Sequence, residues 1–426
     1  MTMSNKPQIF RSSFSRNIGK LMGSGIFVGI LGALCLPIIS RIYAPEDLGS
    51  LQLLISMILV LSSLSTFRLE EALILPTRMY RTEILYILSI LALIVSTVFF
   101  GFVFYIFSDY IFTFFNLPMY SNYVLVVPFG CFVVGLSQIT QMRFVASGSY
   151  SQLSINKISQ SLTNNIGSIG LGYNVASLTS LIVSYLMSFL LVVMIYFLTN
   201  KSRKISAKCY SKKMLFRYLV KYKKYPTINL AGSFLNNLSY HMPVFVLSKS
   251  FGHEAVGFYM MANKLLDMPM ALVASSISQV YMKYAADAFN KGGGELMLLY
   301  KSTLKKLLII SVPYLFVFLG LYFIGVELVL GRNWHGVNVI IILLLCSKVA
   351  QLVTSPISTT LNVVDKQEYG LFFICIFLVL RYALLESGQS LNVAIILYSL
   401  ATSIFYLVIN YFVIVQLLKF SVGINL

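Results

Sequence analysis

Long apolar segments recur along almost the whole chain, separated by short stretches of charged and turn-forming residues. A helix that crosses a bilayer needs roughly 20 mostly apolar residues, and it satisfies its own backbone groups in lipid. The segments therefore predict an all-α polytopic membrane protein with twelve transmembrane helices. The predicted spans are 21–42, 48–67, 84–107, 122–146, 152–172, 176–198, 227–248, 256–282, 304–326, 336–361, 369–386 and 391–416.

Composition supports this class and excludes several kinds of site. Of the 426 residues, 58% are hydrophobic and 11% are charged, whereas soluble domains carry about 25% charged residues. The connections are too short for a soluble catalytic or nucleotide-binding domain, and no phosphate-binding Gly-x-x-x-x-Gly-Lys-Ser/Thr loop occurs. The five cysteines are scattered, with no Cys-x-x-Cys pair. We therefore expect no catalytic residues, no metal and no cofactor.

The formal net charge of +18 follows the predicted topology. Of the 32 basic residues, 26 fall on one side of the predicted spans. The positive-inside rule therefore predicts that both termini are cytoplasmic, and the distribution argues against a nucleic-acid partner. The remaining basic residues lie at outer corners or inside spans, and they are Arg41, Lys249, Lys264, Arg332, Lys348 and Arg381.

A basic segment separates two halves of the chain. Residues 201–224 hold ten basic residues and no acid, interleaved with Tyr, Leu and Phe. The pattern fits an amphipathic helix on anionic membrane lipids, which attract such segments by about 1 kcal/mol per charge. It also fits a plain linker oriented by the positive-inside rule. The predicted domains are a six-helix bundle over 1–200, this linker over 201–224, and a second six-helix bundle over 225–426.

The two halves share a corner motif. Each half places a proline inside its first helix, a cation near the outer end of that helix, and an acid three residues before a glycine. The positions are Pro37, Arg41, Glu46 and Gly49 in the first half, and Pro243, Lys249, Glu254 and Gly257 in the second. Because six spans per half is an even number, the repeat is parallel, and such transporters bind substrate between their halves near the midplane.

Three stretches resemble a known family. Residues 22–26 (Met-Gly-Ser-Gly-Ile), 37–49 and 68–76 (Arg-Leu-Glu-Glu-Ala-Leu-Ile-Leu-Pro) are similar to the O-antigen and capsular-polysaccharide flippases, and so is the polar fifth span, which ends in Gly172. These flippases are bacterial members of the multidrug/oligosaccharidyl-lipid/polysaccharide exporter superfamily. The resemblance implies two six-helix bundles around a central V-shaped cleft that opens to each side in turn.

The resemblance also implies a substrate and a location. The substrate is an undecaprenyl-pyrophosphate-linked oligosaccharide, moved from the cytoplasmic to the outer leaflet of the bacterial inner membrane. A polysaccharide polymerase and a chain-length regulator are the protein partners that it suggests. The chain itself does not choose between an ion gradient and removal of product as the energy source.

Cations inside spans are the candidate contacts for the pyrophosphate. Such residues cost about 2.5–3.5 kcal/mol on insertion scales, and they usually face a cavity. Arg41 is a cleft candidate or a snorkelling residue at the interface. Lys264 lies three residues before Asp267, so the two side chains share a helical face and either bind an anion or neutralise each other. Lys348 has no acid nearby in sequence, which makes it the first choice for an anion contact.

Other polar residues are candidates for a gate or for sugar contacts. Arg68 and Glu70 end the second span, where they form either an inner gate or a surface ion pair. Several amides and one imidazole lie in spans four, five and seven, where they bind either sugars or neighbouring helices. These residues are Gln138, Gln141, Gln160, Asn164, Asn165, Asn229, Asn236, Asn237 and His241.

Two other functions compete with a flippase. An ion-coupled multidrug or toxin exporter of the same superfamily predicts buried acids in the spans, where this chain has mainly cations. A membrane-embedded polysaccharide polymerase or ligase predicts a long, charged outer loop, whereas the longest one here carries only Asp109. The sequence therefore favours anionic cargo.

Overall fold

The computed structural model describes residues 6–76, 79–116, 124–199, 211–291 and 293–421, and α-helices dominate them. Within these residues, nine helices are long and apolar enough to cross a membrane. The chain is therefore an all-α, multi-pass membrane protein, as its sequence predicts. Every predicted span overlaps a helix, and spans 227–248 and 256–282 are two parts of one 62-residue helix, α8.

Packing divides the chain into two compact units. Unit 1 comprises Met1–Tyr43 and Ser50–His241, and unit 2 comprises Ala44–Gly49 and Met242–Leu426. The change of unit thus falls within helices α2 and α8. The domain boundaries predicted from the repeat stay a prediction, and residues 200–210 of the predicted linker lie outside the described part of the chain.

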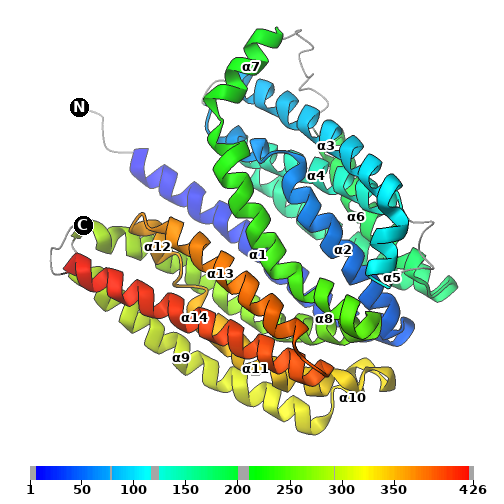
Figure 1. Cartoon of the computed structure of the whole chain (residues 1–426). Helices are drawn as coiled ribbons and strands as arrows, with labels where there is room; N and C mark the ends of the chain where they lie inside the picture. The colour runs from blue at the N-terminus through cyan, green and yellow to red at the C-terminus, as the bar shows by residue number, and fades with distance from the viewer. Residues whose placement is uncertain (1–5, 77–78, 117–123, 200–210, 292, 422–426) are drawn as a thin grey trace, which may run out of the picture. The chain divides into compact units, whose positions relative to one another are not determined.

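Unit 1 is built from the N-terminal helices (Figure 1). They are α1 (Lys6–Ile42), α2 (Pro45–Ser65), η1 (Leu69–Ile74), α3 (Met79–Phe114), α4 (Val126–Ala146), α5 (Tyr150–Asn174), α6 (Leu178–Thr199), α7 (Lys212–Lys221) and η3 (Tyr225–Asn229), followed by the start of α8 (Leu230–Lys291). Helix α5 packs against both α1 and α6, and α4 packs against α3 and α6.

Unit 2 is built from the remainder of α8 and the C-terminal helices. They are α9 (Gly293–Ile324), α10 (Glu327–Leu330), η4 (Arg332–Trp334), α11 (Gly336–Thr354), α12 (Thr360–Val363), α13 (Gln367–Glu386) and α14 (Leu391–Ser421). Helix α14 lies beside α9, α11 and α13 (Figure 1). The predicted span 336–361 ends early, at Thr354, two residues before Pro356, which lacks the backbone N–H that a continuing helix would need.

Two helices differ from the others in polarity. Among the described residues, α5 and α8 are not in the set of nine apolar helices. These two helices carry most of the polar residues that the sequence predicts for sugar and anion contacts. Polar residues within spans are costly in lipid and usually face protein or a cavity.

Gly252 breaks α8 at the predicted second corner. Its φ of 82° and ψ of −179° are not helical. A positive φ of this size suits glycine, which has no Cβ to clash with the backbone. The break turns the chain between the two spans that α8 contains.

The two corner glycines pack against each other inside unit 2. A Cβ on Gly49 would overlap the carbonyl oxygen of His253, and a Cβ on Gly257 would overlap that of Pro45. Each glycine therefore meets the residue four positions before the other glycine. The two contacts are equivalent, which gives the sequence repeat a structural counterpart at this point.

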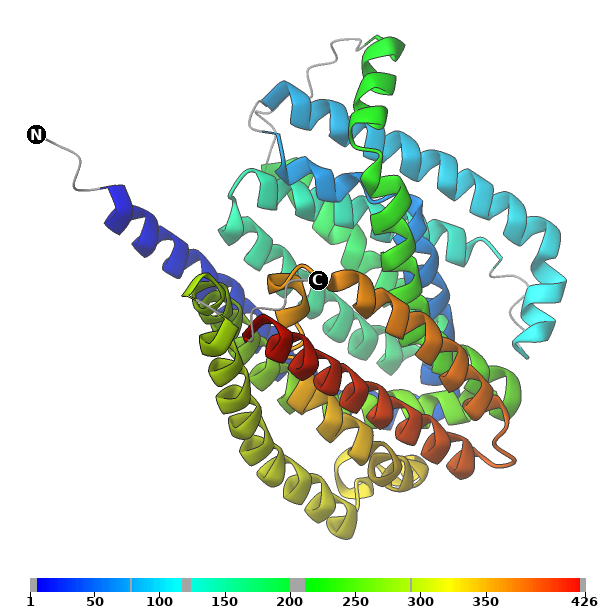
Figure 2. The ribbon, with the colours of Figure 1, turned by 60° about the vertical axis from the view of Figure 1, so that its left-hand side comes forward.

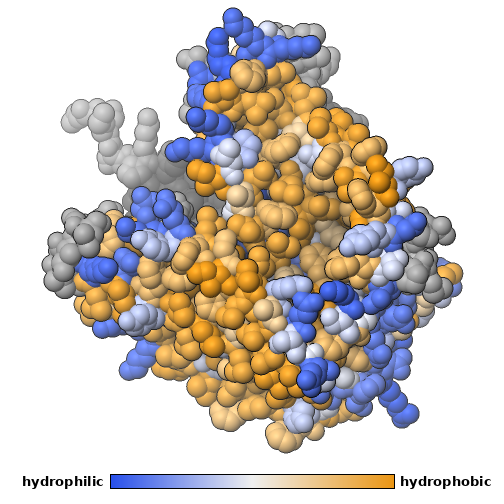
Figure 3. Space-filling model, in the orientation of Figure 1, coloured by the Kyte–Doolittle hydropathy of each residue, from blue (hydrophilic) through white to orange (hydrophobic). Residues whose placement is uncertain are grey.

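Helix α7 is the described part of the basic segment. Its buried face carries Tyr218, which packs with Leu215 and Tyr222 against a hydrophobic core that includes Ile84 and Leu85 of α3. Figure 2 shows α7 beside the start of α3. On the outward face, Phe216 and Val220 are exposed among lysine and arginine side chains, and Figure 3 shows hydrophilic residues gathered over α7. The interaction of this helix with anionic lipids stays a prediction.

Replacing Gly49 or Gly257 with Ala tests the corner contact. Each new methyl group would overlap backbone that cannot rotate away, so we expect a loss of about 1–3 kcal/mol or more. The measurement is the thermal unfolding midpoint of the purified protein in detergent. Gly320→Ala is the matched control, because a Cβ there meets nothing within 4 Å. Equal midpoints in all three variants would contradict the contact.

Candidate functional site

An ion pair joins two helices of unit 2. Lys348 on α11 is buried, and its Nζ donates to Asp267 Oδ1 on α8 at 2.7 Å. The Asp267 side chain keeps 30% of its surface exposed, so the pair lies at the edge of the packed helices. The sequence treats Lys348 as an isolated cation, but folding brings it to an acid 81 positions away.

This pairing leaves Lys264 without the partner that helical spacing suggests. Lys264 is exposed on α8, one turn before Asp267. Among the described residues, the ion pairs include none with Lys264, because the Asp267 carboxylate is bound to Lys348. Two lysines, Lys264 and Lys348, and one acid, Asp267, therefore lie on two helices of unit 2 that this ion pair joins.

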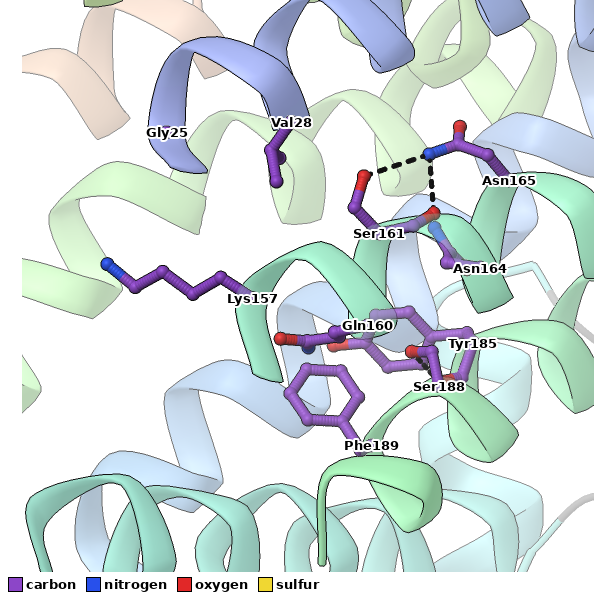
Figure 4. Close-up of a pocket in the computed structure, with 10 residues that line it drawn as sticks. All are labelled: Gly25, Val28, Lys157, Gln160, Ser161, Asn164, Asn165, Tyr185, Ser188 and Phe189. Carbon is purple, nitrogen blue, oxygen red and sulfur yellow. Dashed lines mark hydrogen bonds between the residues drawn. The ribbon is translucent and has the colours of Figure 1, made fainter. Parts of the chain in front are cut away.

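A cavity of about 270 Å³ lies within unit 1, between α1, α5 and α6 (Figure 4). Helix α5 lines it because its polar residues recur at the spacing of one helical face. The lining consists of Gly25 and Val28 from α1, of Lys157, Gln160, Ser161, Asn164 and Asn165 from α5, and of Tyr185, Ser188 and Phe189 from α6. None of these ten residues is acidic, so the cavity combines amides, hydroxyls and one cation.

Aromatic rings form one wall of this cavity. Tyr185 and Phe189 on α6 contact each other edge to face, with ring centroids 5.1 Å apart. On α5, the Asn165 amide donates to the Ser161 carbonyl oxygen at 2.8 Å, which fixes that side chain against its own helix. The sequence predicts Gln160, Asn164 and Asn165 as sugar contacts but misses the aromatic wall and Lys157. A signal for Lys157 was available in the sequence, since helical spacing places it on one face of the helix with Gln160, Ser161 and Asn164.

The polar residues of span seven make structural contacts in unit 1. His241 is buried, and its Nδ1 lies 3.0 Å from Ser56 Oγ on α2. The Asn237 amide donates to the Ser233 carbonyl oxygen of its own helix at 3.0 Å. The contact between His241 and Ser56 joins α8 to α2 and supports the packing interpretation of His241. Gln141 on α4 is half-buried.

Arg68 binds the two acids that follow it. Its Nη1 lies 3.2 Å from Glu71 Oε1 and 3.7 Å from Glu70 Oε1. Glu71 Oε2 also accepts from the Asn229 amide at 3.4 Å, which links η1 to η3. Glu70 is almost fully buried, and this burial raises the pKa of its carboxyl group despite the nearby guanidinium. The structure thus contains the ion pair, while a gating role stays a prediction.

The remaining cations divide between surface and core. Arg41 is exposed in the last turn of α1. Arg143 is buried on α4, with its guanidinium 4.1 Å from the centre of the Tyr86 ring. Within the described part of the chain, no three His, Cys, Asp or Glu side chains gather as a metal site would require.

Comparison with known proteins adds a family and a fold. A family model described as polysaccharide biosynthesis protein matches residues 38–339. Among curated proteins, none matches the sequence. An inward-facing multidrug resistance MATE family transporter of the MOP superfamily has a TM-score of 0.74 at 13% identity, over 93% of this chain and 96% of its own.

Two further structures share this fold. The lipid II flippase MurJ in an inward closed conformation has a TM-score of 0.72 at 14% identity, over 94% of this chain and 89% of its own. A MOP superfamily transporter from Pyrococcus furiosus, described as having a binding pocket of reverse polarity, has a TM-score of 0.58 at 13% identity, over 95% of each chain. The fold is thus one that transporters and flippases use.

A double-mutant cycle tests the ion pair of unit 2. Lys348→Met and Asp267→Asn should each destabilise the protein, and the double variant should lose less than the sum of the two. We expect a coupling of about 0.5–3 kcal/mol, measured from unfolding in detergent. The exposed pair of Lys249 and Glu386, 3.1 Å apart, is the matched control, and its coupling should stay below about 1 kcal/mol. Strictly additive effects at Lys348 and Asp267 would contradict the pair.

Glu70→Gln tests the buried carboxyl group of η1. Because burial raises its pKa, the folded state holds this proton more tightly than the unfolded state does. Stability should therefore fall as the pH rises above 4.5, the ordinary pKa of glutamate. Glu70→Gln should flatten this decline in the unfolding midpoint, whereas the exposed control Glu295→Gln should keep the wild-type slope. An unchanged slope in Glu70→Gln would count against the burial effect.

Proposed function

We propose that this chain, which belongs to the polysaccharide biosynthesis protein family, moves undecaprenyl-pyrophosphate-linked oligosaccharide repeat units of O-antigen or capsule type. Transport runs from the cytoplasmic to the outer leaflet by alternating access. Family and fold confirm the sequence resemblance to the exporter superfamily. The proposal adds the substrate, which the chemistry of the interior supports, and the direction, which follows from the resemblance to the polysaccharide flippases.

The observation that carries the proposal is Lys264, an exposed residue of α8 that makes no ion pair among the described residues. A spanning helix rarely keeps a cation unless it faces a cavity or a partner. Here the nearest acid along the helix, Asp267, is bound to Lys348 at 2.7 Å. Lys264 can therefore offer its charge to an anionic group, and a pyrophosphate supplies such a group with several acceptor oxygens.

The cavity of unit 1 supports the same cargo. Amide side chains donate and accept hydrogen bonds at once, which suits the hydroxyl groups of a sugar. Its lining contains Lys157 and no acid. The amides of this cavity thus suit the glycan part of a lipid-linked oligosaccharide.

The competing function, export of cationic drugs, requires negative charge at the binding site. An exporter of cationic drugs needs a carboxylate that is free to bind cargo or a coupling ion. Asp267 already neutralises Lys348, and Glu70 lies buried in η1, outside the spanning helices. The charge of the interior therefore favours anionic cargo, although the fold is shared with multidrug transporters. A polymerase or ligase has less support, since the similar structures are transporters and a flippase.

The proposed location is the bacterial inner membrane, with both termini cytoplasmic. The distribution of basic residues supports this orientation, because 26 of the 32 lie on one side of the predicted spans. In this orientation α7 lies at the cytoplasmic surface, where its exposed cations and Phe216 meet anionic lipids. A polysaccharide polymerase and a chain-length regulator are proposed partners in the same membrane.

Lys264→Gln tests the proposed anion contact. A hydrogen bond to a charged group contributes about 1.5–3 kcal/mol, so losing it should weaken transport by roughly tenfold or more. The readout is surface polysaccharide and inner-leaflet lipid-linked repeat units in a host whose own copy is deleted. The matched control is Lys283→Gln, an exposed lysine on the same helix, which should restore export as fully as the wild type.

The same strains test the function as a whole. Deletion should remove surface polysaccharide and leave lipid-linked repeat units in the inner leaflet. If surface polysaccharide persists in a host without a second exporter, the proposed function is wrong. If deletion has the expected effect but Lys264→Gln exports normally at wild-type abundance, the function stands and the assignment of Lys264 is wrong.

A further inference from the structure

We propose that the cavity between α1, α5 and α6 is a binding site for a single sugar ring of the transported glycan. This inference rests on the proposed function and assigns a part of the substrate to one place in unit 1. The cavity is about 270 Å³, slightly below the roughly 300–1,000 Å³ typical of ligand pockets. It therefore fits one ring of a repeat unit rather than the whole oligosaccharide.

The walls match the two kinds of surface that a pyranose ring presents. Tyr185 and Phe189 supply an apolar surface for the C–H face of the ring. Gln160 and Asn164, on the opposite helix, supply donors and acceptors for hydroxyl or acetamido groups. Figure 4 shows the Gln160 side chain directed toward the ring of Phe189.

The amide side chains of this site differ in whether they already make hydrogen bonds within the protein. The Asn165 amide is already bound to the Ser161 carbonyl oxygen and hydroxyl, at 2.8 Å and 3.2 Å. For Gln160 and Asn164, the hydrogen bonds among the described residues include none. A sugar can therefore bind to these two side chains without breaking a bond of the protein.

The charge of the lining residues further restricts the class of ligand that can bind. Lys157 is exposed and extends to the edge of the cavity, away from the aromatic rings (Figure 4). With no carboxylate in the lining, a cationic ligand has no counter-ion here. The site thus selects a neutral sugar, or one that carries a carboxylate or phosphate within reach of Lys157.

Gly25 offers a way to fill the cavity without disturbing the protein. It lines the cavity from α1, and a Cβ built there meets no atom within 4 Å. Because Gly25 lines the cavity, we expect a larger side chain at this position to narrow it without overlapping protein atoms. Gly23, two residues earlier, also has no atom within 4 Å of a built Cβ but does not line the cavity.

The experiment compares Gly25→Val with Gly23→Val as full-length proteins in detergent. Two probes are used, namely lipid-linked repeat units extracted from the deletion strain and sugar-free undecaprenyl pyrophosphate. Gly25→Val should weaken binding of the sugar-bearing probe by about tenfold or more and leave the sugar-free probe unchanged. Gly23→Val should bind both probes like the wild type, and both variants should keep the wild-type unfolding midpoint.

A second pair of variants removes hydrogen bonds instead of adding bulk. Asn164→Ala should weaken only the sugar-bearing probe, whereas Asn174→Ala, an exposed amide at the end of the same helix, should have no effect. Wild-type binding of the sugar-bearing probe by both Gly25→Val and Asn164→Ala would overturn the sugar site. Equal loss of both probes in Gly25→Val would also overturn it, since the cavity would then not distinguish the sugar.

Failure of the proposed function gives a different result. If the wild-type protein binds neither probe and its deletion leaves surface polysaccharide unchanged, lipid-linked glycans are not its cargo, and the sugar site falls with that proposal. If the wild type binds the sugar-bearing probe more tightly than the sugar-free one, the proposed function gains support whatever the Gly25 variant does.

Discussion

The ion pair between Lys348 and Asp267 decides which charge the interior of unit 2 presents. A carboxylate on a spanning helix is costly in lipid, and a lysine on the neighbouring helix neutralises it at 2.7 Å. Once this acid is used, Lys264 on the same helix remains as an exposed cation. In the sequence Lys264 and Asp267 look like a self-neutralising pair, but in the structure the acid pairs with Lys348, and the ion pairs among the described residues include none with Lys264.

Unit 1 shows the complementary chemistry. Its cavity combines amides, two aromatic rings and Lys157, and its polar face comes from α5, which is outside the set of nine apolar helices found among the described residues. In the same unit, His241 on α8 contacts Ser56 on α2, and the Asn237 amide donates to the carbonyl oxygen of Ser233 on its own helix. Polar side chains on α5 and α8 therefore have different roles. Those on α8 already make hydrogen bonds within the protein, whereas Gln160 and Asn164 on α5 make none among the described residues.

The corner glycines, Gly49 and Gly257, are the point at which the sequence repeat has a counterpart in the structure. Gly49 and Gly257 allow two helix starts to approach so closely that a methyl group on either would overlap the other's backbone. The contact uses the same position from each repeat. It lies inside unit 2, while α2 and α8 both continue into unit 1. The two helices with the corner motifs are thus the same two that pass from one unit to the other.

The sequence by itself determined the class of protein, the presence of a helix at every predicted span and the corner motifs. These follow from local physics, since lipid demands long apolar helices and a tight corner demands glycine. It also placed Gln160 and Asn164 on one face of α5. Only the tertiary structure decided that Asp267 pairs with Lys348 rather than Lys264, that Arg143 is buried against Tyr86, and that aromatic rings face the α5 amides. These contacts join residues far apart in the chain, and helical spacing carries no information about which helix packs against which.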